Sequence, residues 1–345
     1  MYFHRSRQTI AHLLQTLVFC GLLILGLLVL QTALLPPAVS SDSWPGYVRL
    51  EKNSVDVLFV GNSHAECTFA PMVIYRETGV TSWVLKSGGI NTRQKLAYLE
   101  EALKTQHPKL IVFEIYGFDI PTRNTDYRNA PAFARMPVGL PKISAIFATS
   151  EATATPSLLL PLISNHSRVW ELTGASAPGN TQFTGGALAL TDYGSSDISE
   201  LLIKRKKDPA PLLTQSQLAE NMRYLEQVAE LARKNDCRLI FTISPLLDPS
   251  LKAGCEQIKK RIIETPDLNG ADVLDMNDFY RSIGLQQTDF RDLSHMYVTG
   301  LGKSSTWFAR VVLPIYKVDQ ATKLSPNQKQ WWEKQSAFWM LDYAQ

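Results

Sequence analysis

The chain is poor in cysteine and histidine and has little net charge. Its 345 residues include four cysteines and six histidines, and 35 basic residues against 32 acidic ones leave a net charge of +3. The cysteines form no C-x-x-C pair and have no histidine at metal-ligand spacing, so we expect no structural zinc site. The charges are interspersed rather than gathered on one basic stretch, which argues against a nucleic-acid-binding protein.

Two of the cysteines leave an alternative open. Cys237 and Cys255 lie on either side of an expected strand at residues 239–243. A disulfide between them fits an oxidising compartment, and two buried free thiols fit the spacing at least as well.

One long apolar run is present near the N-terminus. Residues 13–35 contain no charged side chain and are enough to cross a hydrocarbon core of about 30 Å. Arg5 and Arg7 precede the run and the next basic residue is Arg49, so the positive-inside rule predicts a cytoplasmic segment 1–12 and an extracytoplasmic remainder. The run is longer than the ~7–15 apolar residues of a signal peptide. We therefore favour a retained anchor, although Ala38-Val39-Ser40 would suit cleavage.

The rest of the chain alternates strand and helix patterns. After a linker at 36–53, we expect one domain at 54–316, interrupted by an insertion at 119–212 and followed by an aromatic tail at 317–345. The expected strands are 55–60, 82–85, 109–115, 238–243 and 271–276, and the expected helices are 65–78, 92–106, 215–235, 251–263 and 298–313. This alternation predicts an α/β fold with an open parallel sheet of about five strands and helices on both faces.

The insertion and the tail each allow two interpretations. His166, Arg168 and Trp170 form the dense polar and aromatic group of the insertion, and they fit either a substrate or partner contact or a locally satisfied loop. The tail places Trp331, Trp332, Phe338 and Trp339 among polar residues. Such aromatic residues lie at lipid headgroups or pack on a domain surface.

Two short motifs predict the chemistry. Gly61-Asn62-Ser63-His64 follows an expected strand, and Asp292-Leu293-Ser294-His295 precedes the last expected helix. Ser63 is then a nucleophile, His295 its general base and Asp292 the carboxylate that orients the imidazole. In the alternative interpretation, Ser63 and Asp292 only cap helices and His295 is a core residue. This alternative requires that the two motifs arose independently by chance.

Three other polar residues near these motifs are not expected to be catalytic. His64 is a neighbour rather than the base, because adjacent helical side chains point about 100° apart. Glu66 and Glu114 are candidates for hydrogen bonds to the site.

The order and placement of these motifs resemble the SGNH (GDSL-like) hydrolase superfamily over residues 54–315. The resemblance implies a flavodoxin-like fold, the triad Ser63, His295 and Asp292, and an oxyanion hole that uses the amides of Ser63 and Gly88, the latter within Ser87-Gly88-Gly89. The family's Gly-x-Asn block is absent here, since Tyr116-Gly117-Phe118-Asp119 follows the third strand. Asn91 is the candidate replacement for its side-chain donor.

With its membrane anchor and without the Gly-x-Asn block, the chain resembles the tethered SGNH proteins that partner membrane-bound O-acyltransferases in alginate or peptidoglycan O-acetylation and in teichoic-acid D-alanylation. The resemblance implies an O-acyltransferase that modifies a cell-envelope polysaccharide or teichoic acid, with no cofactor and with a membrane-bound O-acyltransferase as donor partner. An esterase or deacetylase acting on the same polymers uses identical residues. A catalytically silent scaffold or glycan-binding subunit is the third interpretation.

Overall fold

A computed structural model describes residues 2–35, 42–118, 120–123, 129–169, 184–191, 198, 203, 212–248, 251, 253–268, 271–319 and 324–343. The chain divides into two compact units. Residues 1–37 and 152–180 form the first, and residues 38–151 and 181–345 form the second. The insertion expected at 119–212 is therefore shared between the two units.

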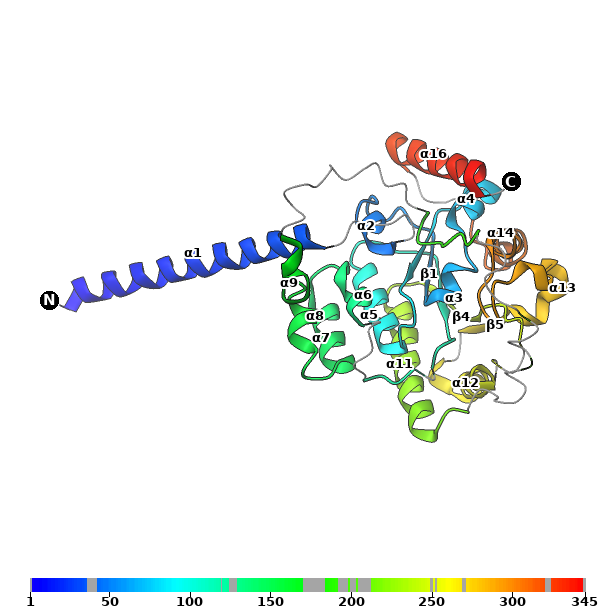
Figure 1. Cartoon of the computed structure of the whole chain (residues 1–345), viewed down its shortest axis with the longest axis horizontal. Coiled ribbons are helices and arrows are strands. Elements are labelled where there is room, and N and C mark those ends of the chain that lie inside the picture. Colours follow the sequence, from blue (N-terminus) through cyan, green and yellow to red (C-terminus); the bar gives the residue numbers. More distant parts are fainter. Residues whose placement is uncertain are drawn as a thin grey trace. The chain divides into compact units, whose positions relative to one another are not determined.

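The larger unit is built on a parallel five-stranded sheet (Figure 1). Its strands are β1 (Val57–Gly61), β2 (Ser82–Lys86), β3 (Leu110–Glu114), β4 (Arg238–Ile243) and β5 (Asp272–Asp275), in the order β2-β1-β3-β4-β5. Every neighbouring pair is parallel. This confirms the expected α/β fold and open parallel sheet. The strand order reverses between β1 and β3, and in doubly wound sheets ligands bind at this switch point beyond the carboxyl ends of the strands.

Helices cover the sheet because both of its faces are apolar. One face packs on α4 (Pro71–Thr78), α14 (Val298–Trp307) and the π-helical segment η6 (Phe308–Val312). There the ring of Phe59 stacks on Phe69 with centroids 4.2 Å apart and meets Phe308 at 5.3 Å. The helices α5 (Thr92–Ala102) and α11 (Gln215–Lys234) contact β1, β2 and β4 as well as each other. The remaining elements of this unit are α2 (Ser43–Tyr47), α3 (Ser63–Glu66), α6 (Asn129–Ala134), α7 (Leu140–Thr149), α12 (Ala253–Glu264), η3 (Pro266–Leu268), η4 (Met276–Phe279), α13 (Tyr280–Ile283), η5 (Gln287–Asp289), α15 (Leu313–Ile315) and α16 (Pro326–Tyr343).

Three segments differ from the expectation. The helix predicted at 65–78 is two helices, α3 and α4, because Ala70 is extended and Pro71 starts a new helix. The linker contains α2, whose Trp44 and Tyr47 are buried. The tail forms α16, in which Trp332 is buried and stacks on Tyr75 at 5.3 Å, so this tryptophan packs on the domain.

The smaller unit contains α1 (Tyr2–Leu34), α8 (Thr155–Leu159) and α9 (Leu162–Asn165), and α9 contacts α1. Within α1, Ile10–Leu34 is a stretch of 25 residues with mean hydropathy 2.6, long and apolar enough to span a membrane. Within the described part of the chain, this is the one helix long and apolar enough to span a membrane, and it lies near the N-terminus.

All four cysteines are free. Cys237 and Cys255 are both buried, so of the two alternatives the structure shows the pair of thiols.

Candidate active site

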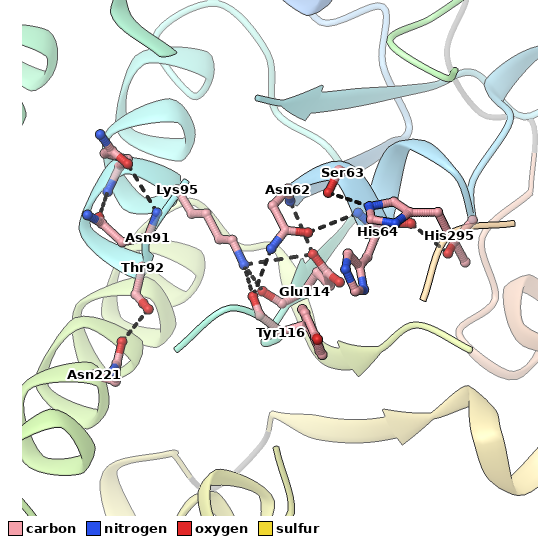
Figure 2. Close-up of polar contacts among 12 residues, drawn as sticks. Asn62, Ser63, His64, Asn91, Thr92, Lys95, Glu114, Tyr116, Asn221 and His295 are labelled. Carbon is pink, nitrogen blue, oxygen red and sulfur yellow. Dashed lines mark hydrogen bonds and ion pairs between the residues drawn. The ribbon is translucent and has the colours of Figure 1, made fainter. Parts of the chain in front are cut away.

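The two motifs meet at the carboxyl edge of the sheet. The Nε2 atom of His295 lies 2.8 Å from the hydroxyl oxygen of Ser63, although the two residues are 232 positions apart in the sequence. The Nδ1 atom of His295 lies 3.0 Å from each carboxylate oxygen of Asp292. Figure 2 shows the Ser63 hydroxyl directed at the imidazole. With Nδ1 donating to Asp292, Nε2 can accept the proton of Ser63, and this is the geometry of a Ser-His-Asp triad.

The Asp292–His295 loop holds its own shape. The Oδ1 atom of Asp292 accepts hydrogen bonds from the backbone N–H of Ser294 at 2.8 Å and of His295 at 2.9 Å. The N–H of Arg291 donates to the carbonyl of His295 at 2.9 Å, and this closes the loop. Its tip is fixed to the segment after β4, because the N–H of Leu247 donates to the carbonyl of Leu293 at 2.9 Å. The carboxylate therefore orients the loop and the imidazole together.

Two opposing influences act on the Asp292 carboxyl. Partial burial raises its pKa, while the hydrogen bonds and charge of His295 and the N–H groups of Ser294 and His295 lower it, and the net pKa is well below the usual range. Asp292 is therefore ionised at neutral pH. An ionised carboxylate stabilises the imidazolium that forms when His295 takes a proton.

The turn that presents Ser63 begins with Gly61, and any larger residue at this position would force its neighbours to move. A Cβ atom on Gly61 would lie 2.8 Å from the Glu114 carboxylate and would also collide with the Cβ atom of Ala65. The next residue, Asn62, caps α3 by accepting the N–H of His64 at 2.9 Å. Its own N–H donates to Oε2 of Glu114 at 3.1 Å. The peptide before Ser63 is thus fastened to β3.

A buried lysine completes this support. The side chains of Lys95 and Glu114 are each 1% exposed, and their charged atoms are 3.7 Å apart. The Lys95 ammonium donates to the carbonyls of Glu114 at 3.0 Å and Tyr116 at 2.6 Å, and the Asn62 amide donates to the same Tyr116 carbonyl at 3.1 Å. Figure 2 shows Lys95 reaching from α5 to this cluster. Burial raises the pKa of Glu114 and the charge of Lys95 opposes that rise.

His64 lies beside the triad without joining it. Its ring stacks on Tyr116 with centroids 3.8 Å apart and meets the ring of His295 edge-on at 4.8 Å. Burial, followed by the nearby His295 and Lys95, lowers the pKa of His64 well below its usual value. The Nδ1 atom of His64 is buried and has no hydrogen-bond partner, in keeping with the expectation that His64 is a neighbour rather than the base.

The oxyanion candidates occupy different environments. Gly88 is exposed in the loop after β2, and nothing lies within 4 Å of the place that a Cβ atom would occupy. Asn91 is buried at the start of α5, where its Oδ1 accepts the N–H of Gln94 at 3.0 Å. The Asn91 amide donates to the carbonyls of Thr122 at 3.0 Å and Pro121 at 3.4 Å. Asn91 is therefore engaged as a helix cap and loop tie, whereas Gly88 has open space beside it.

Glu66 pairs with Lys86 at the end of β2. Burial raises the pKa of Glu66 and the charge of Lys86 opposes that rise.

The candidate contact group of the insertion belongs to the smaller unit. His166 is exposed, and its Nδ1 lies 2.9 Å from the carbonyl of Ile163. Arg168 is half-buried, and Trp170 lies outside the described residues. The structure therefore leaves the substrate-contact interpretation of these residues as a prediction.

Lys95 is the site residue that sequence reasoning missed. The position of Lys95 in the sequence could have indicated its burial, because Leu96, Leu99 and Ala102 of the same helix are also buried. A lysine among buried positions requires a partner, and Glu114 in the apolar strand β3 is the matching carboxylate.

No model of a known protein family matches the chain, and no curated protein matches it either.

Proposed function

We propose that the chain is a membrane-anchored serine acyltransferase of the SGNH type, working outside the cytoplasm on hydroxyl groups of a cell-envelope polysaccharide or teichoic acid. The observation that carries the proposal is the 2.8 Å approach of His295 Nε2 to the Ser63 hydroxyl, with Asp292 behind the imidazole. The membrane-length helix and the two arginines before it, Arg5 and Arg7, favour the location.

In the first half-reaction, the Ser63 oxygen attacks an ester or thioester carbonyl while His295 takes the hydroxyl proton. The negative charge on the carbonyl oxygen is received by the amides of Ser63 and Gly88. When the tetrahedral intermediate collapses, the bond to the leaving alcohol or thiol breaks and His295 returns the proton to it. The acyl group is then an ester on Ser63.

In the second half-reaction, His295 removes a proton from an acceptor hydroxyl, whose oxygen attacks the seryl ester. The acyl group passes to the acceptor, and Ser63 regains its proton from His295. A membrane-bound O-acyltransferase would supply the donor, because cytoplasmic acyl carriers do not reach a domain outside the membrane.

Hydrolysis is the second candidate, and the exposure of the site favours it. The side chains of His295 and Asp292 are 27% and 31% exposed, and Ser63 is partly exposed as well. Water therefore has access to an acyl-enzyme unless a bound acceptor or partner covers it. Incubation with an ester donor and a short glycan separates the two, since free acid alone indicates an esterase and an acylated glycan indicates transfer.

Intact-mass spectrometry after incubation with a chromogenic acetyl ester tests the nucleophile. We expect one acetyl adduct on the wild-type chain and none on Ser63→Ala. Ser294→Ala is the matched control, because the Ser294 hydroxyl also lies near the imidazole, at 3.2 Å from Nδ1. An adduct that persists in Ser63→Ala would overturn the mechanism, and a folded wild type that takes no acetyl group from any ester would favour the scaffold interpretation.

A further inference from the structure

Exposed apolar side chains are concentrated in one segment outside α1. Of the large hydrophobic residues beyond α1 that are exposed in the described part of the chain, half fall within residues 138–169. Residues 136–165 contain only two charged residues, Lys142 and Glu151. Scattered exposed apolar residues are ordinary, whereas a concentration of them marks an interaction surface.

Within the larger unit, helix α7 arranges these residues as a stripe. Leu140 is 81% exposed, Ile143 36% and Phe147 56%, and this spacing places them on one side of a helix. The other side packs on α5 through the buried Ala145 and Ile146. The exposed stripe therefore adds nothing to the core.

The single charge of α7 is kept away from the stripe. Lys142 is buried, and its ammonium donates to the carbonyl of Met136 at 3.1 Å. At the start of the helix, the Lys104 ammonium is paired with the Glu101 carboxylate at 2.6 Å. At its end, the exposed Arg123 donates to the carbonyl of Phe147 at 3.0 Å. An apolar helix face with a cation at its end suits a lipid surface that carries anionic headgroups.

The covalent chain ties α7 to the membrane-length helix. Residues 150–154 join α7 to α8, and six Cα steps span at most about 20 Å. In the smaller unit, α9 follows α8 closely and contacts α1 (Figure 1). Leu34, at the end of α1, is buried, whereas most of the earlier apolar residues of this helix are exposed. The segment that joins α7 to α8 is thus shorter than the thickness of a bilayer, which is about 40–45 Å.

We propose that the stripe formed by Leu140, Ile143 and Phe147 lies in the leaflet at which α1 emerges, so that the domain meets the lipid at a second point. This inference rests on the membrane anchor of the proposed function and not on its chemistry. Contact at two points would fix how the Ser63 site faces the membrane, where an acyl donor arrives. The occupant is lipid, because only the short segment between α7 and α8 separates the stripe from the unit that carries the membrane-length helix, and an exposed arginine lies at the end of the stripe.

Site-directed spin labelling of the full-length chain tests this proposal in vesicles of equal parts phosphatidylcholine and phosphatidylglycerol, without any partner protein. Cys20 is the exposed cysteine and lies in α1, while the other three are buried. A label on Cys20 serves as the membrane reference. Labels at Leu140→Cys and Phe147→Cys are then placed singly in a Cys20→Ser background, and Ile263→Cys on α12, an apolar position 69% exposed, is the matched control.

We expect labels at 140 and 147 to collide with lipid-dissolved oxygen in preference to a water-soluble nickel chelate, as the Cys20 label does, and the label at 263 to show the reverse. Nickel-accessible labels at 140 and 147 beside an oxygen-accessible Cys20 would overturn this inference alone. A nickel-accessible Cys20 would overturn the anchor as well. Dipolar broadening at 147 that disappears on dilution with unlabelled chain would show that the stripe binds a second copy of the chain instead of lipid. Lipid contact at 263 would show that lipid contact is not specific to the stripe, and this would also overturn the inference.

Discussion

The groups of the candidate triad and the charged pair beneath them differ in their access to water. His295 and Asp292 are partly exposed, on a loop that holds its shape through local hydrogen bonds. Lys95 and Glu114, one layer below, are almost fully buried and connect α5, β3 and the turn before Ser63. Surface hydrogen bonds are exchangeable with water, whereas buried charges depend on every partner. Changes in the loop should therefore alter chemistry, and changes in the buried layer should alter stability first.

The largest effect is expected from Asp292→Asn. The amide cannot stabilise the imidazolium, and it favours the wrong tautomer of His295, so kcat should fall by about 10⁴-fold. The melting temperature should change little because the loop is partly exposed and Asn retains an oxygen that can accept its backbone N–H groups. Steady-state kinetics with a chromogenic ester and thermal unfolding would measure both, and a loss of activity smaller than about tenfold would contradict the role of Asp292.

Glu114→Ala should show the opposite balance. It leaves the Lys95 ammonium buried without its carboxylate and the Asn62 N–H without its acceptor, which should lower the free energy of unfolding by about 3–5 kcal/mol. The control is Glu114→Gln combined with Lys95→Met, which removes both charges and retains an acceptor for Asn62. Denaturant unfolding should show much of the loss recovered in the double variant. Equal losses in the single and double variants would indicate that the charge pair does not matter.

His64 lies between the two layers, and its substitutions separate ring contacts from proton transfer. His64→Ala removes the contacts with Tyr116 and His295, worth about 0.5–1.5 kcal/mol, and should lower kcat/KM by about two- to tenfold. His64→Phe keeps a ring of similar shape and should retain most of the activity. If the phenylalanine variant is as slow as the alanine variant, a ring nitrogen of His64 participates in the chemistry.

Asn91→Ala tests the helix cap against the oxyanion hole. Loss of the cap should cost about 1 kcal/mol of stability with kcat unchanged. Removal of an oxyanion donor would lower kcat by about 10²–10³-fold. Asn91→Asp is the matched control, since its carboxylate still accepts the N–H of Gln94 but donates nothing. Kinetics of the two variants therefore decide whether the Asn91 amide reaches the reacting carbonyl.

The smallest expected effect is the pH dependence of the Asp292 contribution to stability. Its folded pKa is depressed, so its stabilisation is fully present above the unfolded value of about 3.9 and is lost as the pH falls further. The stability gap between wild type and Asp292→Asn, about 1 kcal/mol or less at this partly exposed site, should close under acid. Thermal unfolding over a pH series measures the gap, and a gap that widens below pH ~4 would contradict the depressed pKa.

Local patterns predicted the elements well where apolar periodicity and turn residues decide them. The strands at 57–61, 82–86 and 110–114 lie within two residues of their expected bounds. The expected helix at 65–78 is divided, because Pro71 starts a new helix, and the segment expected to be a linker contains α2, in which Trp44 and Tyr47 are buried. Burial of that kind depends on distant surfaces such as Trp83, which local patterns do not reveal.

The sequence by itself determined the α/β alternation, the membrane-length apolar helix and the two motifs that name Ser63, Asp292 and His295. Only the tertiary structure decided that Ser63 and His295 meet at 2.8 Å, that Lys95 lies beneath them, and that Asn91 is engaged as a cap. The reason is the distance along the sequence over which each kind of interaction acts. Strand and helix patterns arise between near neighbours, whereas polar contacts join residues that are brought together only by the order and register of the parallel strands.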